Sequence, residues 1–271
     1  IYFYDSSLDV SVIKHVVIEY AARGLWCSKA HPSLRNSLLA NNLIAVYLSD
    51  SSSPIIGCII RDNQEHGIYL ERSCSPWIAN NHITRCNNGI YVNGSYQGSP
   101  TIRNNIIRNN VGYGIRVGSY YTPTITFNTL DVDGTGIYLA TSSGHKSTLS
   151  SNIITSCNIG ISRAHGDYTL SYNDYWDNGA NTSGLSPGAT DLALDPWYVD
   201  WLIADVRLQD VSPLLSAAQD GGEIGAFGAG GNPPLLTGSY STLPTTSGSL
   251  TQNEIWSGLI EVTGNVTVPF G

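Results

Sequence analysis

The sequence of 271 residues contains no methionine, few charged residues and no long apolar run. Charged residues make up 13% of the chain. No segment approaches the roughly 18 consecutive apolar residues of a transmembrane helix, so we expect no membrane span. Because methionine is absent and the sequence opens with Ile1, we expect a fragment, a processed product or a domain of a longer protein.

The cysteines lack the spacing of a disulfide framework or a zinc site. They are Cys27, Cys58, Cys74, Cys86 and Cys157. Their number is odd, and no Cys-x-x-Cys or His/Cys cluster has the spacing of zinc ligands. We therefore expect small buried thiols rather than covalent cross-links.

The net charge of −8 is unevenly distributed. Residues 1–166 carry 12 Lys and Arg against 9 Asp and Glu, whereas residues 167–223 carry one Arg against 10 acids. A chain with a pI near 5.0 and no basic stripe is not expected to bind nucleic acid. The mildly basic first part could attract an acidic polysaccharide at low salt.

What the sequence does contain is a repeat of Gly, an aliphatic residue and an aromatic residue, as in Gly67-Ile68-Tyr69. Its central position recurs every 21 to 25 residues, at Leu25, Val46, Ile68, Ile90, Ile115, Ile137 and Ile161. A fixed period of this size is typical of a solenoid, in which each repeat buries its apolar face only by stacking on its neighbours.

A polar residue just before an aliphatic pair keeps the same period. This column comprises Ser37, Cys58, Asn81, Asn105, Asn128, Asn152 and Asn173. Short bursts rich in Ile, Val and Tyr, bounded by Gly, Asn, Ser or Pro, predict about three short strands per repeat. The regular Leu and helical return segment of a leucine-rich repeat are absent.

These marks resemble the right-handed parallel β-helix family, the fold of pectate lyases and of many secreted bacterial surface proteins. The resemblance implies an all-β, single-stranded right-handed parallel β-helix of about seven to nine coils with a C-terminal cap. It also implies that the Asn side chains stack inside one turn, each amide bonding to the next coil. Cys58 and Ser37 are expected to make this ladder imperfect at its N-terminal end.

The domain organisation follows from composition. Residues 1–189 are predicted to form the coils. Residues 190–228 resemble the closing segment of secreted β-helix proteins and are predicted to form the cap. Residues 229–249, rich in Gly, Pro, Ser and Thr, indicate a linker. Residues 250–271 resemble the opening strands of a further β-helix module, or else fold back to cap their own module.

One outward column of residues follows from the alternation of side chains along a strand. If Ile68 points into the core, Tyr69 points outward. The equivalent positions are Trp26, Tyr47, Tyr69, Tyr91, Arg116, Tyr138 and Ser162. Exposed rings in a row suit the C–H faces of sugars, so the first six are candidate polysaccharide-binding residues. The alternative is that the rings stack on one another and cover the sheet.

Charged residues follow this column on adjacent repeats: Lys29, Asp50, Glu71 and Arg72. A polysaccharide lyase needs a base and a cation that neutralises the uronate carboxylate. Lys29 or Arg72 is the candidate base, and Asp50 with Glu71 could hold the metal. The same two acids could serve a hydrolase, which needs carboxylates about 5–9 Å apart. Surface salt bridges are the alternative.

Two further sets of polar residues recur in the sequence. Calcium, the one cofactor that the sequence suggests, takes oxygen ligands such as those of an acidic loop region. The candidates are Asp174, Asp177, Asp191, Asp195 and Asp200, with a plain solvated surface as the alternative. Another column, interpreted as a solvated sheet face, comprises Arg61, Thr84, Arg108, Asp131 and Thr155.

The function favoured by these patterns is that of a secreted or cell-surface module that binds or scaffolds polysaccharide without catalysis. One alternative is a lyase or glycoside hydrolase that acts on an acidic polysaccharide. A second is a structural filament or sheath subunit that stacks end to end. Further β-helix modules of the same polypeptide are the other expected partners.

Overall fold

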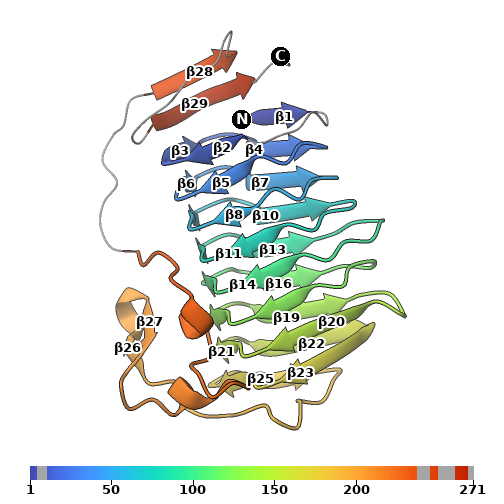
Figure 1. Ribbon diagram of the computed structural model, residues 1–271, viewed down its shortest axis with the longest axis vertical. Coiled ribbons are helices and arrows are strands. Elements are labelled where there is room, and N and C mark those ends of the chain that lie inside the picture. The colour runs from blue at the N-terminus through green and yellow to red at the C-terminus, as the bar shows by residue number, and fades with distance from the viewer. Residues whose placement is uncertain (5–10, 237–244, 250–259, 268–271) are drawn as a thin grey trace.

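The computed structural model describes residues 1–4, 11–236, 245–249 and 260–267. It is a column of about eight stacked coils, all parallel β, with almost no helix. Figure 1 shows the coils following one another along the long axis from the N-terminal end. This confirms the predicted parallel β-helix.

Each coil contributes three strands, which build three faces. The first face holds β2 (Val12–Lys14), β5 (Ser33–Arg35), β8 (Ile55–Ile56), β11 (Trp77–Ala79), β14 (Thr101–Arg103), β17 (Thr124–Thr126), β20 (Lys146–Ser150) and β23 (Asp167–Ser171). The second face holds β3 (Val16–Glu19), β6 (Leu38–Ala40), β9 (Ile59–Arg61), β12 (His82–Thr84), β15 (Ile106–Arg108), β18 (Thr129–Asp131), β21 (Ile153–Thr155) and β24 (Asp174–Trp176). The third face holds β1 (Tyr2–Tyr4), β4 (Arg23–Ser28), β7 (Ile44–Ser49), β10 (His66–Glu71), β13 (Asn88–Val92), β16 (Tyr113–Val117), β19 (Thr135–Ala140), β22 (Ile159–His165) and β25 (Ala180–Ser183).

Left-handed backbone conformations make the corners between faces. Between the first and second faces, every coil has one residue with positive φ: His15, Asn36, Gly57, Asn80, Asn104, Phe127, Ser151 and Tyr172. Only one of these eight is glycine, although the conformation costs an L-residue roughly 1–2 kcal/mol. The stacked side chains and hydrogen bonds between coils must offset this cost.

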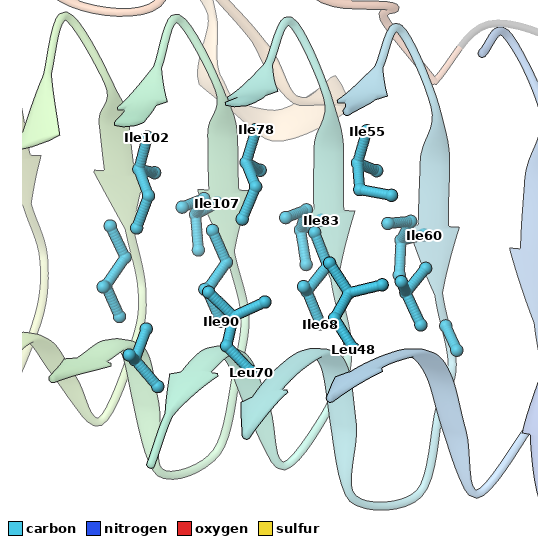
Figure 2. Packing of buried hydrophobic residues seen from close by; sticks show 14 of the residues in the cluster. Leu48, Ile55, Ile60, Ile68, Leu70, Ile78, Ile83, Ile90, Ile102 and Ile107 are labelled. Atoms are coloured by element: carbon cyan, nitrogen blue, oxygen red, sulfur yellow. The ribbon is translucent and has the colours of Figure 1, made fainter. Parts of the chain in front are cut away.

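Aliphatic side chains fill the narrow interior, as the repeat predicts. All seven central residues of the repeat are fully buried, and they pair in register from coil to coil. Figure 2 shows the stacked rows, with Ile55, Ile78 and Ile102 from the first face opposite Ile68 and Ile90 from the third. The five cysteines are buried thiols that form no disulfide, as expected.

The predicted asparagine ladder is present at the corner between the first and second faces. The Nδ2 of Asn81 donates to Oδ1 of Asn105 at 3.0 Å, and the same bond continues through Asn128 and Asn152 to Asn173. At the N-terminal end, Cys58 joins the ladder through its backbone N–H, which donates to Oδ1 of Asn81 at 2.9 Å. The ladder thereby satisfies polar groups that no water reaches.

A second ladder, which the sequence analysis did not predict, runs along the corner between the second and third faces. Its positions are Asn42, Asn63, Cys86, Asn110, Asp133, Cys157 and Asn178. Asn110 donates to Oδ1 of Asp133 at 2.9 Å, and burial raises the pKa of that carboxyl well above its usual value. Cysteine and aspartate within the series hid its regularity.

The predicted cap divides into two parts. Residues 185–194 close the last coil, because Leu185 packs on the core and the N–H of Tyr175 donates to the carbonyl of Leu192. Residues 196–236, here called the flank segment, turn back along the second face (Figure 1). They contain β26 (Tyr198–Asp200), η1 (Trp201–Ile203), β27 (Asp205–Leu208), η2 (Pro213–Ser216) and η3 (Gly228–Gly230).

The flank segment reaches far toward the N-terminal coils. The Nδ1 of His82 lies 3.0 Å from the carbonyl oxygen of Pro234, and burial lowers the pKa of this histidine to about 4. The N–H of Asn232 donates to Asn80, and Leu236 packs against the buried cluster of Val17, Leu38, Ala40 and Ile59. Residues 229–236 of the expected linker therefore lie against the second face instead of spanning solvent.

Two strands of the predicted further module are described, β28 (Thr245–Ser249) and β29 (Ile260–Thr267). They pair with each other in parallel, and β29 also pairs with β3 and β1 of the first coil. This is the arrangement of strands that fold back on their own module (Figure 1). The remaining residues of 237–271 lie outside the described part of the chain.

Candidate functional site

The predicted aromatic column lies in register on the third face. Trp26 pairs with Tyr47, Tyr47 with Tyr69, and Tyr69 with Tyr91. Arg116 and Tyr138 continue the column on the next two coils. Tyr47 is buried and the other five side chains are partly exposed, so the column forms part of the surface.

The rings of Tyr47, Tyr69 and Tyr91 stack on one another, and Trp26 meets Tyr47 edge to face. Ring centroids of Tyr47 and Tyr69 are 5.1 Å apart, and those of Tyr69 and Tyr91 are 5.6 Å apart. The Arg116 guanidinium lies over the Tyr91 ring at 4.5 Å. The faces of the rings therefore contact one another, and their edges and hydroxyl groups are what the column offers to a ligand.

Two residues that the sequence analysis missed complete the column. The His66 ring stacks on Tyr69 and Tyr91 at 5.2 and 4.6 Å, and the Arg23 guanidinium lies 4.1 Å from the ring of Trp26. His66 and Arg23 each stand three positions before a residue of the column, so strict alternation would point their side chains into the core. It fails here because two successive residues, such as Gly67 and Ile68, both face inward.

The predicted charged patch gathers at one end of the third-face strands. Arg72 lies 3.8 Å from the carboxylate of Asp50 and 3.9 Å from that of Glu71. Oε2 of Glu71 accepts hydrogen bonds from the hydroxyl groups of Tyr47 at 2.8 Å and Ser49 at 3.1 Å. Burial, followed by the hydrogen bond to Glu71, raises the pKa of Tyr47 to about 12.

These contacts define what the patch can do chemically. Lys29, Asp50 and Arg72 occupy equivalent positive-φ corners of successive coils, which explains why they gather. The carboxylate of Glu71 is engaged by two hydroxyl groups, and that of Asp50 by Arg72 and the N–H of Ser73. Asp50, Glu71 and Arg72 thus make ion-pair contacts with one another through Arg72, and a catalytic role of the patch stays a prediction.

The five aspartates proposed for calcium have separate roles. Asp191 ends the first ladder by accepting from the Asn173 amide at 3.2 Å, and Asp200 caps η1. Asp195 accepts from the N–H of Trp197, and Asp174 from the N–H of Leu194. Asp177 is exposed at a corner. Among the described residues, no three His, Cys, Asp or Glu side chains gather to hold a metal ion.

The column interpreted as a solvated face is covered over part of its length, which corrects that interpretation. Arg108 and Asp131 form an ion pair at 3.1 Å whose side chains are 7% and 0% exposed. Nε1 of Trp201 donates to both carboxylate oxygens of Asp131, and the hydroxyl of Thr155 donates to one of them. The flank segment covers these charges, and it begins about 40 residues after Thr155.

The flank segment also creates a groove that no sequence motif indicated. A cavity of about 640 Å³ lies between it and the last coils, lined by Trp176, Trp197 and Trp201 among others. These are three of the six tryptophans in the chain, gathered within 26 residues. That local concentration is the signal by which the groove could have been suspected.

A comparison with protein-family models gives a match over residues 23–175, to the right-handed beta helix region. This chain belongs to the right-handed β-helix family. The match covers more than half of the chain, including every position of the aromatic column, and ends just before Trp176. A search of curated proteins finds no match.

Membership of the β-helix family establishes the scaffold and not its activity, because one scaffold carries many functions. Within the described residues, no helix is long and apolar enough to cross a membrane.

Proposed function

We propose that this β-helix protein is a secreted or cell-surface module that binds polysaccharide along its third face without cleaving it. The observation that carries the proposal is the in-register column of aromatic and arginine side chains on six consecutive coils, from Trp26 to Tyr138. At about 4.8 Å per coil the column spans about 24 Å, which suits an extended chain of sugars.

The contacts within the column determine the kind of binding that it supports. Because the ring faces are stacked, sugars would meet ring edges, tyrosine hydroxyl groups and the outer N–H groups of Arg23 and Arg116. Guanidinium groups bind carboxylates well. The stacked column holds these donors in fixed positions, which lowers the entropy cost of binding. An acidic polysaccharide is the ligand that fits this set best.

The charged patch supports binding better than catalysis. Arg72 pairs with both Asp50 and Glu71, and Glu71 also accepts from the hydroxyl groups of Tyr47 and Ser49. A catalytic base needs a lone pair that is free to reach the substrate. The lyase or hydrolase alternative therefore has a single supporting observation, the proximity of Asp50 and Glu71 to the same arginine.

The filament alternative has less support. End-to-end stacking would use the strand edge of the first coil, and β29 already pairs with β1 and β3 there.

A glycan-array screen tests the proposal. We expect the wild-type protein to bind an extended acidic polysaccharide and the Tyr69→Ala/Tyr91→Ala double variant to lose that binding. Tyr96→Ala is the control, because this tyrosine is 58% exposed and lies outside the column. Circular dichroism establishes that the variants are folded. If a folded double variant binds as well as wild type, or if wild type binds no acidic polysaccharide, the proposal is wrong.

A further inference from the structure

The groove beneath the flank segment has the composition of a carbohydrate site, and it is separate from the third face. The last coils supply Trp176 and Asp177 to its wall, and the flank segment supplies Trp197 and Trp201. The three indole side chains are 40%, 47% and 42% exposed. A volume of about 640 Å³ is in the range of small-molecule sites, roughly 300–1,000 Å³.

The indole of Trp201 is held in place by buried residues of the second face. Its Nε1 donates to both carboxylate oxygens of Asp131 at 3.1 and 3.0 Å, and Asp131 is itself locked by its buried ion pair with Arg108. One edge of the ring is therefore anchored in the protein, while part of its surface lies at the groove. Burying a charged pair has a desolvation cost. Its use to fix the indole of Trp201 therefore suggests that the position of this side chain is important.

Trp197 is held by the backbone around it. Its φ of 51° lies in the left-handed region, which a bulky residue rarely adopts. The N–H of Trp197 donates to Asp195 at 2.9 Å, and its carbonyl accepts from the N–H of Gln209, also at 2.9 Å. Strain of this kind persists where the surroundings over-determine the conformation, and it often marks a binding site.

The polar lining determines which ligand fits. Asp177, Asp195 and Gln209 lie at the groove together with the hydroxyl-bearing Thr155 and Ser156. Among the described residues, no Lys, Arg or His lines the groove, and Arg108, which pairs with the Asp131 that holds Trp201, is buried. Carboxylates and amides accept hydrogen bonds from sugar hydroxyl groups, whereas two carboxylates repel the acid groups of uronates.

We propose that this groove is a second carbohydrate site, which binds a short stretch of an uncharged pyranoside chain. The indoles of Trp176, Trp197 and Trp201 stack on the C–H faces of the sugar rings, and Asp177 and Asp195 accept hydrogen bonds from their hydroxyl groups. The site does not depend on the aromatic column, because it lies on the second face. The two sites would select sugars of different charge.

Titration of the full chain with cellohexaose, xylohexaose, mannohexaose and hexagalacturonate, followed by tryptophan fluorescence and calorimetry, tests this site. We expect at least one uncharged hexamer to bind and to change the fluorescence. Trp197→Ala is expected to weaken that binding by about tenfold or more, as the loss of about 1.4 kcal/mol of contact implies. Trp77→Ala, a tryptophan that is 51% exposed on the first face, serves as the matched control and should bind as wild type does.

Three results would overturn the proposal: no binding of any uncharged hexamer, equal losses in Trp197→Ala and Trp77→Ala, or tighter binding of hexagalacturonate at a site that Trp197→Ala abolishes. Asp177→Asn provides a second test, since asparagine also tolerates the positive φ of this corner. It should reduce the discrimination against hexagalacturonate. The Tyr69→Ala/Tyr91→Ala variant should bind the uncharged hexamer normally, so this site and the third face can fail independently.

Discussion

Replacing Asn128 by alanine tests whether the first ladder holds the coils together. The Asn128 amide donates to the carbonyls of Ile102 at 3.0 Å and Thr126 at 3.1 Å, and to Oδ1 of Asn152 at 3.0 Å. Its Oδ1 accepts from the backbone N–H and the side-chain amide of Asn105 at 3.0 and 2.9 Å. Asn128→Ala removes all five of these contacts. Because the two amide hydrogens are shared among three acceptors, this corresponds to about four full hydrogen bonds, and the side chain is fully buried.

The magnitude follows from these contacts. A net contribution of about 1 kcal/mol per hydrogen bond gives a loss of about 4 kcal/mol in the free energy of unfolding. The partner groups stay buried without a replacement, so the loss approaches the exceptional range for one substitution. For a chain of this size, about 2–4 °C per kcal/mol corresponds to a decrease in Tm of about 8–16 °C.

Thermal unfolding followed by circular dichroism measures this decrease. Asn93→Ala is the control, because Asn93 is exposed in a nearby loop, and it should change the free energy by no more than about 0.5 kcal/mol. A Tm for Asn128→Ala close to that of the control would refute the reasoning, since the ladder would then contribute no net stability.

Three further predictions concern titration, the flank segment and catalysis. Burial raises the pKa of Asp174 from 3.8 to about 7, so the folded state keeps a proton that the unfolded chain loses. The free energy of unfolding should therefore fall between about pH 4 and pH 7, by at most about 4 kcal/mol. In Asp174→Asn, the Tm should decrease less over this pH range than the Tm of wild type does. Equal decreases in Tm for the two proteins would contradict the assignment. Asp131→Ala leaves Arg108 buried without its partner, so the free energy of unfolding measured in urea should fall by about 3–5 kcal/mol. The flank segment should also become accessible to trypsin at Arg207. Resistance to trypsin equal to that of wild type would show that the ion pair does not hold the segment. The lyase or hydrolase alternative requires that the wild type cleaves an acidic polysaccharide. In that case Glu71→Gln should abolish the cleavage without a change in Tm. Unchanged turnover would eliminate Glu71 as a catalytic residue.

The repeat period was enough to predict the coils and their interior. The spacing predicted that the seven central residues of the repeat, the first being Leu25 and the last Ile161, lie in the core, and all seven are fully buried in register. The same spacing located the polar column, and the resemblance to the β-helix family predicted that its asparagines form a ladder with a weaker start at Cys58. These features repeat along the chain, so each coil provides independent support for the same assignment.

The sequence left the role of the aromatic column open between two alternatives. Which side chains share a face follows from strand alternation, but whether their rings stack depends on side-chain torsions and on neighbours such as His66. The structure shows the stacking. Binding of polysaccharide by Trp26, Tyr47, Tyr69, Tyr91, Arg116 and Tyr138 stays a prediction, as does catalysis by the charged patch.

The covering of the second face lay beyond any pattern in the sequence. Trp201 contacts Asp131 across 70 positions, and Pro234 contacts His82 across 152. Periodicity predicts which side chains point outward, because alternation and stacking are properties of a strand and its nearest coils. It carries no information on which outward side chains a distant, non-repeating segment will cover. That depends on the three-dimensional fit of the flank segment to the second face, which buries the Arg108–Asp131 pair and forms the tryptophan groove.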